Sequence, residues 1–191
     1  MIPRLVVASK NPDKVTEIEG ILQTLGLTEE IVRELDWADI DETGDTLEEN
    51  ALLKARAVSA TVGLPAVADD TGLEVAALGG RPGVNTARFA GIGASYSDNV
   101  HLLLEELEGV ADRRARFRTV VALVYPDGGE VVAEGAVDGV ITFDPRGEQG
   151  FGYDPVFEVD GRTLAEMSLA EKNRFSHRAR ALRALAETLQ P

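Results

Sequence analysis

Two adjacent carboxylates, Asp69 and Asp70, follow a short apolar run, Ala66 to Ala68, and precede a glycine-rich segment. Like charges this close repel each other, so the pair indicates either a turn, for which Asp-Thr-Gly is suitable, or a bound cation. Hard divalent ions such as Mg²⁺ bind carboxylate oxygens and usually take only one or two of them, alongside phosphate and water. One aspartate of this pair and one acid from the loop with Asp41 and Glu42 would be a sufficient protein contribution. Open α/β sheets bind ligands at the carboxyl ends of their strands, where we expect this pair to lie.

Two segments offer groups that suit a phosphate. Ser9 to Lys14, with the sequence SKNPDK, stands where an expected strand hands over to a helix, so backbone N–H groups and the positive helix end point into the gap. This is not a glycine-rich phosphate loop, and taken alone it is best interpreted as an N-capped helix with a solvated lysine. Asn50 and Lys54 are four residues apart on one helix face, which could reach a ligand or simply face solvent.

Two further segments could bind a flat ring. In GFGYDPVF, Gly150 to Phe157, two glycines bracket Phe151, so the backbone could approach a ring on which the phenylalanine stacks; an aromatic corner of the core is about as good an interpretation. His177 stands beside Arg178 near the C-terminus. A lone surface histidine usually has no function, and we interpret His101 in that way.

Composition limits the classes of function. The chain has 191 residues, 44% hydrophobic and 27% charged, which is enough for one globular domain. Its net charge of −14 disfavours a nucleic acid polymer but not a small anion held by a few lysines. Cysteine is absent, no apolar run is long enough to span a bilayer, and the start lacks the pattern of a signal peptide. We therefore expect a cytoplasmic protein with no membrane contact.

The order of elements predicts an α/β fold with a mixed sheet and flanking helices, because helices and strands alternate early and strands cluster late. The expected strands are 4–9, 29–35, 66–68 and several within 114–142. The first two strands within 114–142 are expected to be joined by a turn at 127–129. The expected helices begin at Pro12 after an Asn11 cap, after Asp45 or Thr46, after Ser97, and at a capping box from Ser168 to Glu171 that opens a helix to about Leu189.

Five segments taken together are more specific than any one alone: SKNPDK, ETGDTLEENALLKA, ADDTGLEVAALGGRPGVNTARFAG, GFGYDP and SHR. In this order they closely resemble the inosine triphosphate pyrophosphatase family, which acts on non-standard purine nucleoside triphosphates such as ITP, dITP and XTP. The resemblance covers the chain from Leu5 to the last helix. It implies a single domain over residues 1–191, an elongated fold whose two lobes flank a central nucleotide cleft, and a homodimer. It also implies Mg²⁺-dependent hydrolysis of a triphosphate to the monophosphate and pyrophosphate.

The resemblance assigns roles to individual residues. Asp70 would be the catalytic residue, binding the metal and accepting the proton of the attacking water, and Asp69 would set the turn or orient a neighbouring group. The second metal ligand would be Glu42 or its neighbour Asp41. The implied phosphate and sugar contacts are Ser9, Lys10, Asn11, Pro12, Asp13, Lys14, Lys54, Thr71 and Lys172, and the implied base pocket is Phe151, Gly152, Tyr153, Asp154, His177 and Arg178.

Some positions depart from the family pattern, and other functions remain as alternatives. Ser9-Lys10 replaces a common Thr-Gly pair, and Thr71 replaces a serine, so both hydroxyls are kept, but the partner of Lys10 is not evident. A nucleotide-binding module without hydrolysis would not need Asp70 and Glu42. An aspartyl phosphatase would need a second acid motif downstream. A pyrophosphatase of related fold that acts on modified pyrimidines is the nearest alternative, and GFGYDP and SHR weigh against it.

Overall fold

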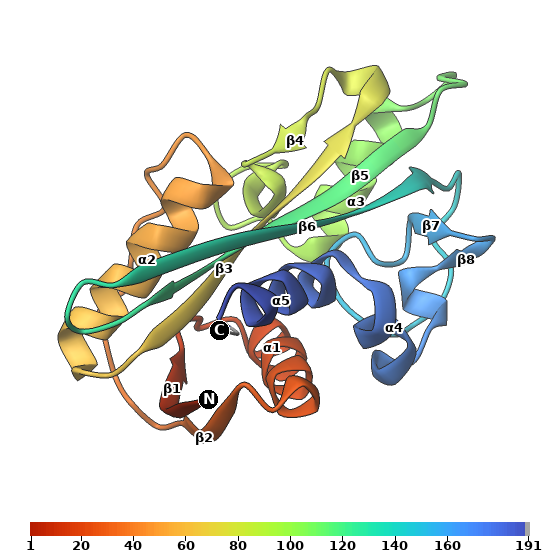
Figure 1. The fold of residues 1–191 in the computed structure, drawn as a ribbon. Coiled ribbons are helices and arrows are strands. Elements are labelled where there is room, and N and C mark those ends of the chain that lie inside the picture. The colour runs from red at the N-terminus through yellow and green to blue at the C-terminus, as the bar shows by residue number, and fades with distance from the viewer. Residues whose placement is uncertain (190–191) are drawn as a thin grey trace. The chain divides into compact units, whose positions relative to one another are not determined.

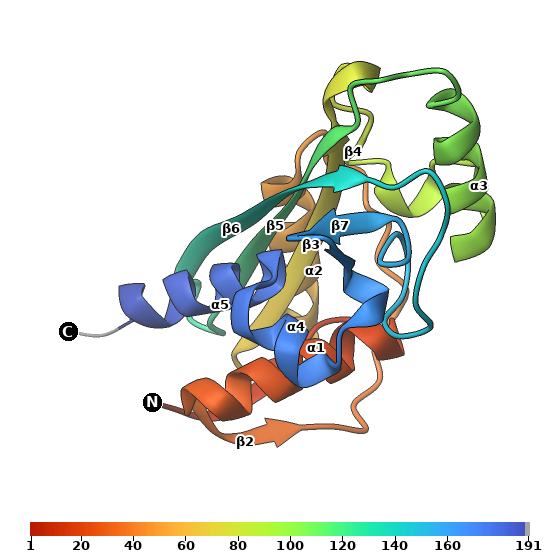
Figure 2. The same cartoon turned by 90° about the vertical axis from the view of Figure 1, so that its right-hand side faces the viewer.

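The computed structural model describes residues 1–189, and Figure 1 and Figure 2 show its elements. The helices are α1 (Pro12–Leu25), α2 (Leu47–Val62), α3 (Tyr96–Glu106), α4 (Leu169–Phe175) and α5 (His177–Thr188), with short 3₁₀ turns at Ala76–Leu78, Thr86–Arg88 and Leu164–Glu166. The strands are β1 (Ile2–Val7), β2 (Thr28–Val32), β3 (Ala66–Val75), β4 (Pro82–Gly83), β5 (Arg114–Val124), β6 (Glu130–Ile141), β7 (Phe157–Val159) and β8 (Arg162–Thr163). None of the helices in this described part is long and apolar enough to cross a membrane.

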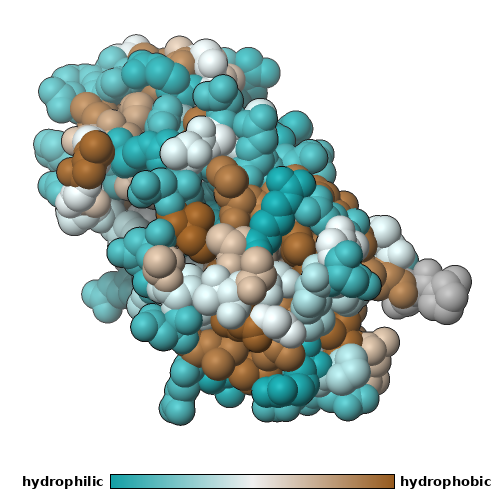
Figure 3. Space-filling model, turned by 90° about the vertical axis from the view of Figure 1, so that its left-hand side faces the viewer, coloured by the Kyte–Doolittle hydropathy of each residue, from teal (hydrophilic) through white to brown (hydrophobic). Residues whose placement is uncertain are grey.

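The strands form one mixed sheet in the order β2-β1-β3-β5-β6-β7-β8, with β4 on β3. Strand β1, next to the edge strand β2, is parallel to both β2 and β3, whereas β4 is antiparallel to β3 and β7 is antiparallel to β6. The predicted α/β class with a mixed sheet is confirmed. Figure 3 shows hydrophilic side chains over much of one face, with hydrophobic patches between them, as is ordinary for a surface exposed to water.

The chain divides into two compact units, which are described separately. Unit 1 comprises residues 1–70, 119–135 and the segment from His177 onward; unit 2 comprises 71–118 and 136–176. The core of unit 1 contains Leu5, Ile18, Leu22, Leu182 and Leu185, all without exposed surface. The helices α1 and α5 pack against each other in this unit, side by side in both ribbon views (Figures 1 and 2).

Local hydrogen bonding fixes the helices of unit 1 where the sequence predicts them. Asn11 caps α1, because its Oδ1 accepts hydrogen bonds from the N–H groups of Asp13 and Lys14, and Pro12 occupies the first helical position. Thr46, rather than Asp45, caps α2 and forms a reciprocal capping box with Glu49.

The strand that carries the two aspartates is longer than predicted. The predicted strand 66–68 is β3, which runs through Asp69 and Asp70 to Val75, so no turn occurs at Asp-Thr-Gly. Pairing beyond the aspartates, with Leu73 opposite Gly83, outweighs the local turn preference. Because successive side chains of a strand point to opposite faces, the two carboxylates diverge instead of facing each other. The predicted turn at Asp69 is therefore wrong.

Two helix boundaries near unit 2 also differ from prediction. Helix α3 is capped by Ser95 and not by Ser97, because Ser95 and Asp98 form a reciprocal capping box. The predicted C-terminal helix does open at the Ser168 capping box, but it is two helices. Ser176 takes an extended conformation with ψ of 160°, which ends α4 before α5 begins at His177.

The core of unit 2 lies under β7, α3 and the nearby parts of β3, β5 and β6. Its fully buried members include Leu73, Leu103, Val156 and Phe157, and the rings of Phe117 and Phe157 lie 4.5 Å apart between centroids. These apolar contacts position the segment that carries Phe151.

Candidate functional site

The carboxylate of Asp70 lies in unit 1 in contact with two side chains of α2. Its Oδ2 accepts a hydrogen bond from Asn50 Nδ2 at 3.2 Å, and its Oδ1 lies 3.3 Å from Lys54 Nζ. Lys54 Nζ also donates to Glu42 Oε1 at 2.5 Å. One ammonium group therefore bridges two carboxylates that are 28 residues apart in the sequence.

Asn50 anchors the acidic loop to the strand. Its side chain has no exposed surface; while Nδ2 bonds to Asp70, its Oδ1 accepts the N–H of Gly44 at 2.8 Å. A Cβ atom on Gly44 would lie 2.7 Å from Asn50 Oδ1 and 2.6 Å from Glu49 Cβ, so only glycine allows this approach. Asn50 does not face solvent, which was one of the two alternatives that the sequence left open, and its side chain holds the loop so that Glu42 contacts Lys54. The other alternative, contact with a ligand, stays a prediction.

Burial and neighbouring charges set the protonation of this group. Burial raises the pKa of Asp70 above its usual range, although Lys54 and Lys14 oppose that shift. Burial alone would lower the pKa of Lys54, but the carboxylates of Asp70, Asp69 and Glu42 outweigh it and raise the pKa. The lysine is therefore charged at neutral pH, and it compensates the two carboxylates beside it.

The donor set of Asp70 and Glu42 fits a hard divalent cation. Both groups are carboxylates, both contact one positive charge at the same point, and Mg²⁺ needs only one or two carboxylates when phosphate and water complete its shell. Asp41 is exposed, whereas Glu42 contacts Lys54, which favours Glu42 as the second ligand. The described residues contain no cluster of three or more metal-binding side chains, so phosphate and water would have to supply the remaining ligands of such an ion.

Asp69 is bound on the opposite side of β3 by cations from α1 and α5. Its Oδ2 accepts from Arg178 Nη2 at 2.9 Å and from Nε at 3.1 Å, and its Oδ1 lies 3.4 Å from Lys14 Nζ. Burial alone would raise the pKa of Asp69, but Lys14, Arg178 and Lys54 hold it well below its usual range. The two adjacent aspartates therefore contact different cations, although Lys14 and Lys54 each act to lower the pKa of both.

Arg178 is buried and forms ion pairs with two carboxylates. Besides Asp69, its Nη1 donates to Glu17 of α1, and both Arg178 and Glu17 are almost without exposed surface. A contact between Arg178 and a purine would require some of these bonds to open, and its base-reading role stays a prediction. Sequence reasoning missed Glu17; the available signal was an acid one turn after Lys14 and next to the apolar Ile18 on α1.

The segment from Ser9 to Lys14 is fixed mainly by its own hydrogen bonds. Ser9 Oγ accepts the N–H of Asn11 at 3.2 Å, and Asn11 caps α1. Lys10 Nζ donates to Asp39 at 2.6 Å, which identifies the partner that the sequence left open. Lys14 is half-buried beside Asp69 and is not simply solvated. Pro12 and Asp13 are exposed in the first turn of α1, and their contact with substrate stays a prediction.

In unit 2, Asp154 and Lys172 organise the segment with Phe151. Lys172 Nζ bonds to Asp154 Oδ2, and both side chains are only 3% exposed. The same oxygen accepts the N–H of Phe151 at 2.9 Å, and Lys172 Nζ lies 5.0 Å from the centroid of the Phe151 ring, over its face. A Cβ atom on Gly150, whose φ is 72°, would lie 2.1 Å from Asp154 Oδ2, so this turn requires glycine.

The other predicted base-pocket and sugar residues have varied settings. Tyr153 is buried and its hydroxyl donates to the backbone oxygen of Thr86 at 3.1 Å, so its side chain supports the core of unit 2. Gly152, with φ of 63°, has open space where a side chain would lie. His177 is buried at the start of α5 in unit 1. Thr71 follows Asp70 on β3 and is half-buried.

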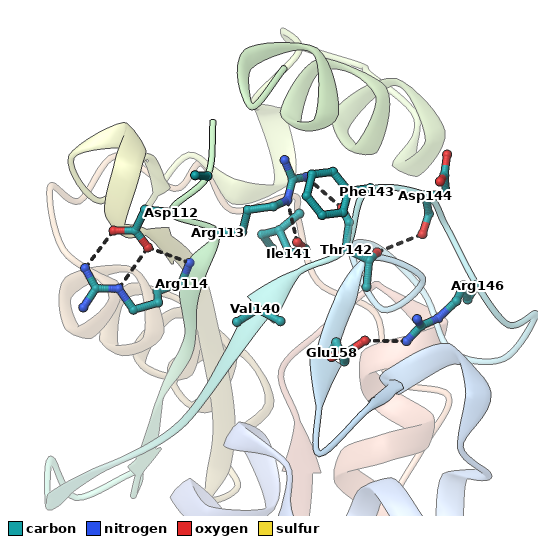
Figure 4. Close-up of a pocket in the computed structure, with 11 residues that line it drawn as sticks. Asp112, Arg113, Arg114, Val140, Ile141, Thr142, Phe143, Asp144, Arg146 and Glu158 are labelled. Atoms are coloured by element: carbon teal, nitrogen blue, oxygen red, sulfur yellow. Dashed lines mark hydrogen bonds and ion pairs between the residues drawn. The ribbon is translucent and has the colours of Figure 1, made fainter. Parts of the chain in front are cut away.

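A separate pocket of about 540 Å³ in unit 2 does not suit a triphosphate (Figure 4). Arg113 in this pocket donates to the backbone oxygens of Leu107, Ile141 and Thr142, and its guanidinium stacks on the exposed ring of Phe143. The other arginines that line it are paired: Arg114 with Asp112 and Arg146 with Glu158. These cations are already satisfied by the fold, and no site is assigned there.

The fold and the groups of unit 1 define a class of protein: an α/β protein with a mixed sheet, in which buried carboxylates on β3 are paired with lysines of neighbouring helices. The chain belongs to the Ham1 family, whose sequence pattern matches residues 5–188, and the resemblance found in the sequence is thereby confirmed. It is 50% identical to the dITP/XTP pyrophosphatase of Thermus thermophilus over 188 residues, covering 96% of this chain and 90% of that protein. It is 49% identical over 186 residues to that of Deinococcus radiodurans, covering 96% and 92%.

Solved structures agree with this assignment. A HAM1 protein from Coxiella burnetii superposes with a TM-score of 0.86 at 41% identity, covering 98% of each chain. The Ham1 protein of Staphylococcus aureus superposes with a TM-score of 0.83 at 39% identity, covering 97% of each chain.

Proposed function

We propose that this protein hydrolyses non-standard purine nucleoside triphosphates, among them ITP, dITP and XTP, to the monophosphate and pyrophosphate. The observation that carries the proposal is the Glu42–Lys54–Asp70 arrangement, in which a buried carboxylate faces a lysine and a second acid. The names of the relatives, dITP/XTP pyrophosphatases at 45–50% identity over almost the whole chain, support the substrate class.

The residues of unit 1 account for the phosphate chemistry. Lys54 and Lys14 offer positive charge to the triphosphate, and Asp70 accepts the proton of the attacking water. Its raised pKa suits this role, because a base works best when its pKa approaches the working pH. The water oxygen forms a bond to the α-phosphorus, the bond from that phosphorus to the bridging oxygen breaks, and pyrophosphate leaves with the electron pair.

Mg²⁺ is proposed as the cofactor, with Asp70 and Glu42 as its ligands. When bound, the ion would neutralise phosphate charge and lower the pKa of a coordinated water. Lys54 holds the two carboxylates together in this structure, so they are positioned for a cation before any substrate binds.

Phe151 and its neighbours in unit 2 account for stacking of the base. Phe151 offers a ring for stacking, held through its backbone by Asp154 and approached by Lys172. Stacking is available to every purine, so discrimination between bases needs hydrogen bonds as well, for which His177 and Arg178 are proposed. We further propose that the protein acts as a homodimer on the nucleotide pool of the cytoplasm.

The test is a product analysis with five substrates. The protein is incubated with ITP, XTP, dITP, ATP and GTP, each with and without Mg²⁺, and released pyrophosphate and orthophosphate are measured separately. We expect Mg²⁺-dependent release of pyrophosphate from ITP, XTP and dITP, with ATP and GTP hydrolysed far more slowly. Release of orthophosphate would support a phosphatase, and binding without hydrolysis would support a sensing module; either result would overturn the proposal. Preferential hydrolysis of a modified pyrimidine triphosphate would do the same.

A further inference from the structure

The ring of Phe151 has an aromatic neighbour, Tyr96, that the sequence analysis did not single out. Tyr96, the first residue of α3, lies with its ring centroid 5.8 Å from that of Phe151, at an interplanar angle of 41°. Both residues belong to unit 2. The distance and tilt fall within the range in which aromatic rings attract each other.

The backbone at Tyr96 is held in place by the start of its helix. Ser95 Oγ accepts the N–H of Asp98 at 3.1 Å, while the Asp98 carboxylate accepts the N–H of Ser95 at 2.8 Å and its hydroxyl at 2.6 Å. Asn99 of the same helix ties α3 to the preceding loop by donating to the oxygen of Ala87 and accepting the N–H of Ala90. The tyrosine is therefore presented from a rigid position.

The neighbours of Phe151 explain why a second ring matters. Lys172 Nζ lies over one face of the Phe151 ring and is itself fixed by Asp154, so that face is not open to a stacked base. Asp154 also fixes the Phe151 backbone, but it does not fix the rotation of the phenyl ring. Tyr96 remains 42% exposed although it contacts that ring, so its side chain is only partly used in packing the fold.

We propose that Tyr96 is a positioning residue for base binding: its ring holds the Phe151 ring in the orientation on which the purine stacks. This inference rests on the proposed function, because it assumes that Phe151 receives the base. Tyr96 acts through Phe151, so its effect falls on substrate binding and not on the phosphate chemistry of unit 1.

The test is steady-state kinetics on ITP with Tyr96→Ala, Tyr96→Phe and, as a matched control, Ile92→Ala. Ile92 is 99% exposed in the loop before α3, so its removal takes away an apolar side chain without touching Phe151. We expect Tyr96→Ala to raise KM about three- to tenfold, which corresponds to the interaction energy of one aromatic pair. The kcat should stay within about twofold of the wild-type value. Tyr96→Phe keeps the ring and should restore the wild-type KM, and Ile92→Ala should have the wild-type KM as well.

A double-mutant cycle with Phe151→Ala separates an effect of Tyr96 that acts through Phe151 from a direct contact of Tyr96 with the substrate. Adding Tyr96→Ala to Phe151→Ala should change KM by less than about 1.5-fold, because the ring through which Tyr96 acts is gone. Any one of three results would overturn the inference and leave the proposed function standing. The KM of Tyr96→Ala could be unchanged, Tyr96→Ala could raise KM as much in the Phe151→Ala background as in the wild type, or Tyr96→Phe could raise KM as much as Tyr96→Ala. Failure of the wild-type protein to hydrolyse any purine triphosphate would instead overturn the proposed function, and the inference with it.

Discussion

Arg178→Ala should destabilise the protein strongly, because Arg178 compensates two buried acids. Its guanidinium donates to Asp69 through Nε and Nη2 and to Glu17 through Nη1, and all three residues are nearly fully buried. Removing one partner of a buried ion pair typically costs about 3–5 kcal/mol, since the remaining charge is left without compensation. Asp69 keeps Lys14 at 3.4 Å, so we expect a loss near the lower end, about 3 kcal/mol.

Urea unfolding at pH 7 measures this loss, and the melting temperature should fall by roughly 6–12 °C in a chain of this size. The matched control is Arg180→Ala on the same helix, where the arginine is exposed and the expected change is within about 0.5 kcal/mol. The reasoning is refuted if Arg178→Ala costs less than about 1 kcal/mol, or if the control costs as much.

The same variant tests whether Arg178 also reads the base. If Arg178 donates to the 6-oxygen of hypoxanthine, Arg178→Ala should lower kcat/KM for ITP by at least about tenfold. The ratio of kcat/KM for ITP to kcat/KM for ATP should fall as well. Both rates must be measured below the unfolding transition of the variant. An unchanged ratio would confine Arg178 to the ion pairs with Asp69 and Glu17.

Three further expectations concern the charged groups of unit 1. Lys54→Ala should weaken triphosphate binding more than monophosphate binding, and equal losses in a calorimetric titration would place Lys54 away from the phosphate chain. Glu42→Gln should raise the Mg²⁺ concentration needed for half-maximal hydrolysis, whereas Asp41→Asn, a change at the exposed neighbour, should not; the reverse pattern would move the metal ligand to Asp41. Because the pKa of Asp69 is lowered by folding, ionised Asp69 stabilises the fold above its unfolded-state pKa of about 4, and this stabilisation is lost as the pH falls further. Asp69→Asn should therefore make the free energy of unfolding fall less steeply with decreasing pH in the acid range. A fall as steep in the variant as in the wild type would show that other groups cause it.

Local rules predicted the parts of the fold that depend on neighbouring residues. The caps at Asn11 and Ser168 involve hydrogen bonds within three residues, and they lie where the sequence places them. The cap of α3 could have been found in the same way, since Asp98 stands three residues after Ser95 and completes a capping box that Ser97 cannot form.

Contacts between distant segments were beyond the sequence. Asp-Thr-Gly favours a turn locally, but pairing of Leu73 with Gly83 keeps β3 extended. The spacing on α1 could have marked Glu17 as a residue of interest, but its partner Arg178, 161 residues later, could not be found from the sequence of either helix. The family resemblance indicated which residues are functional, whereas only the structure shows that Asp69 contacts Lys14 and Arg178 while Asp70 contacts Lys54.

The most direct test of the account is the rate of Mg²⁺-dependent pyrophosphate release from ITP by Asp70→Asn. The amide is nearly the same shape as the carboxylate, but it can neither accept the proton of water nor bind the metal as an anion. Circular dichroism and the melting temperature would establish that the variant is folded. We predict a loss of rate on the order of a hundredfold or more. A folded variant that keeps more than about a tenth of the wild-type rate would contradict the assignment of Asp70 as the catalytic base.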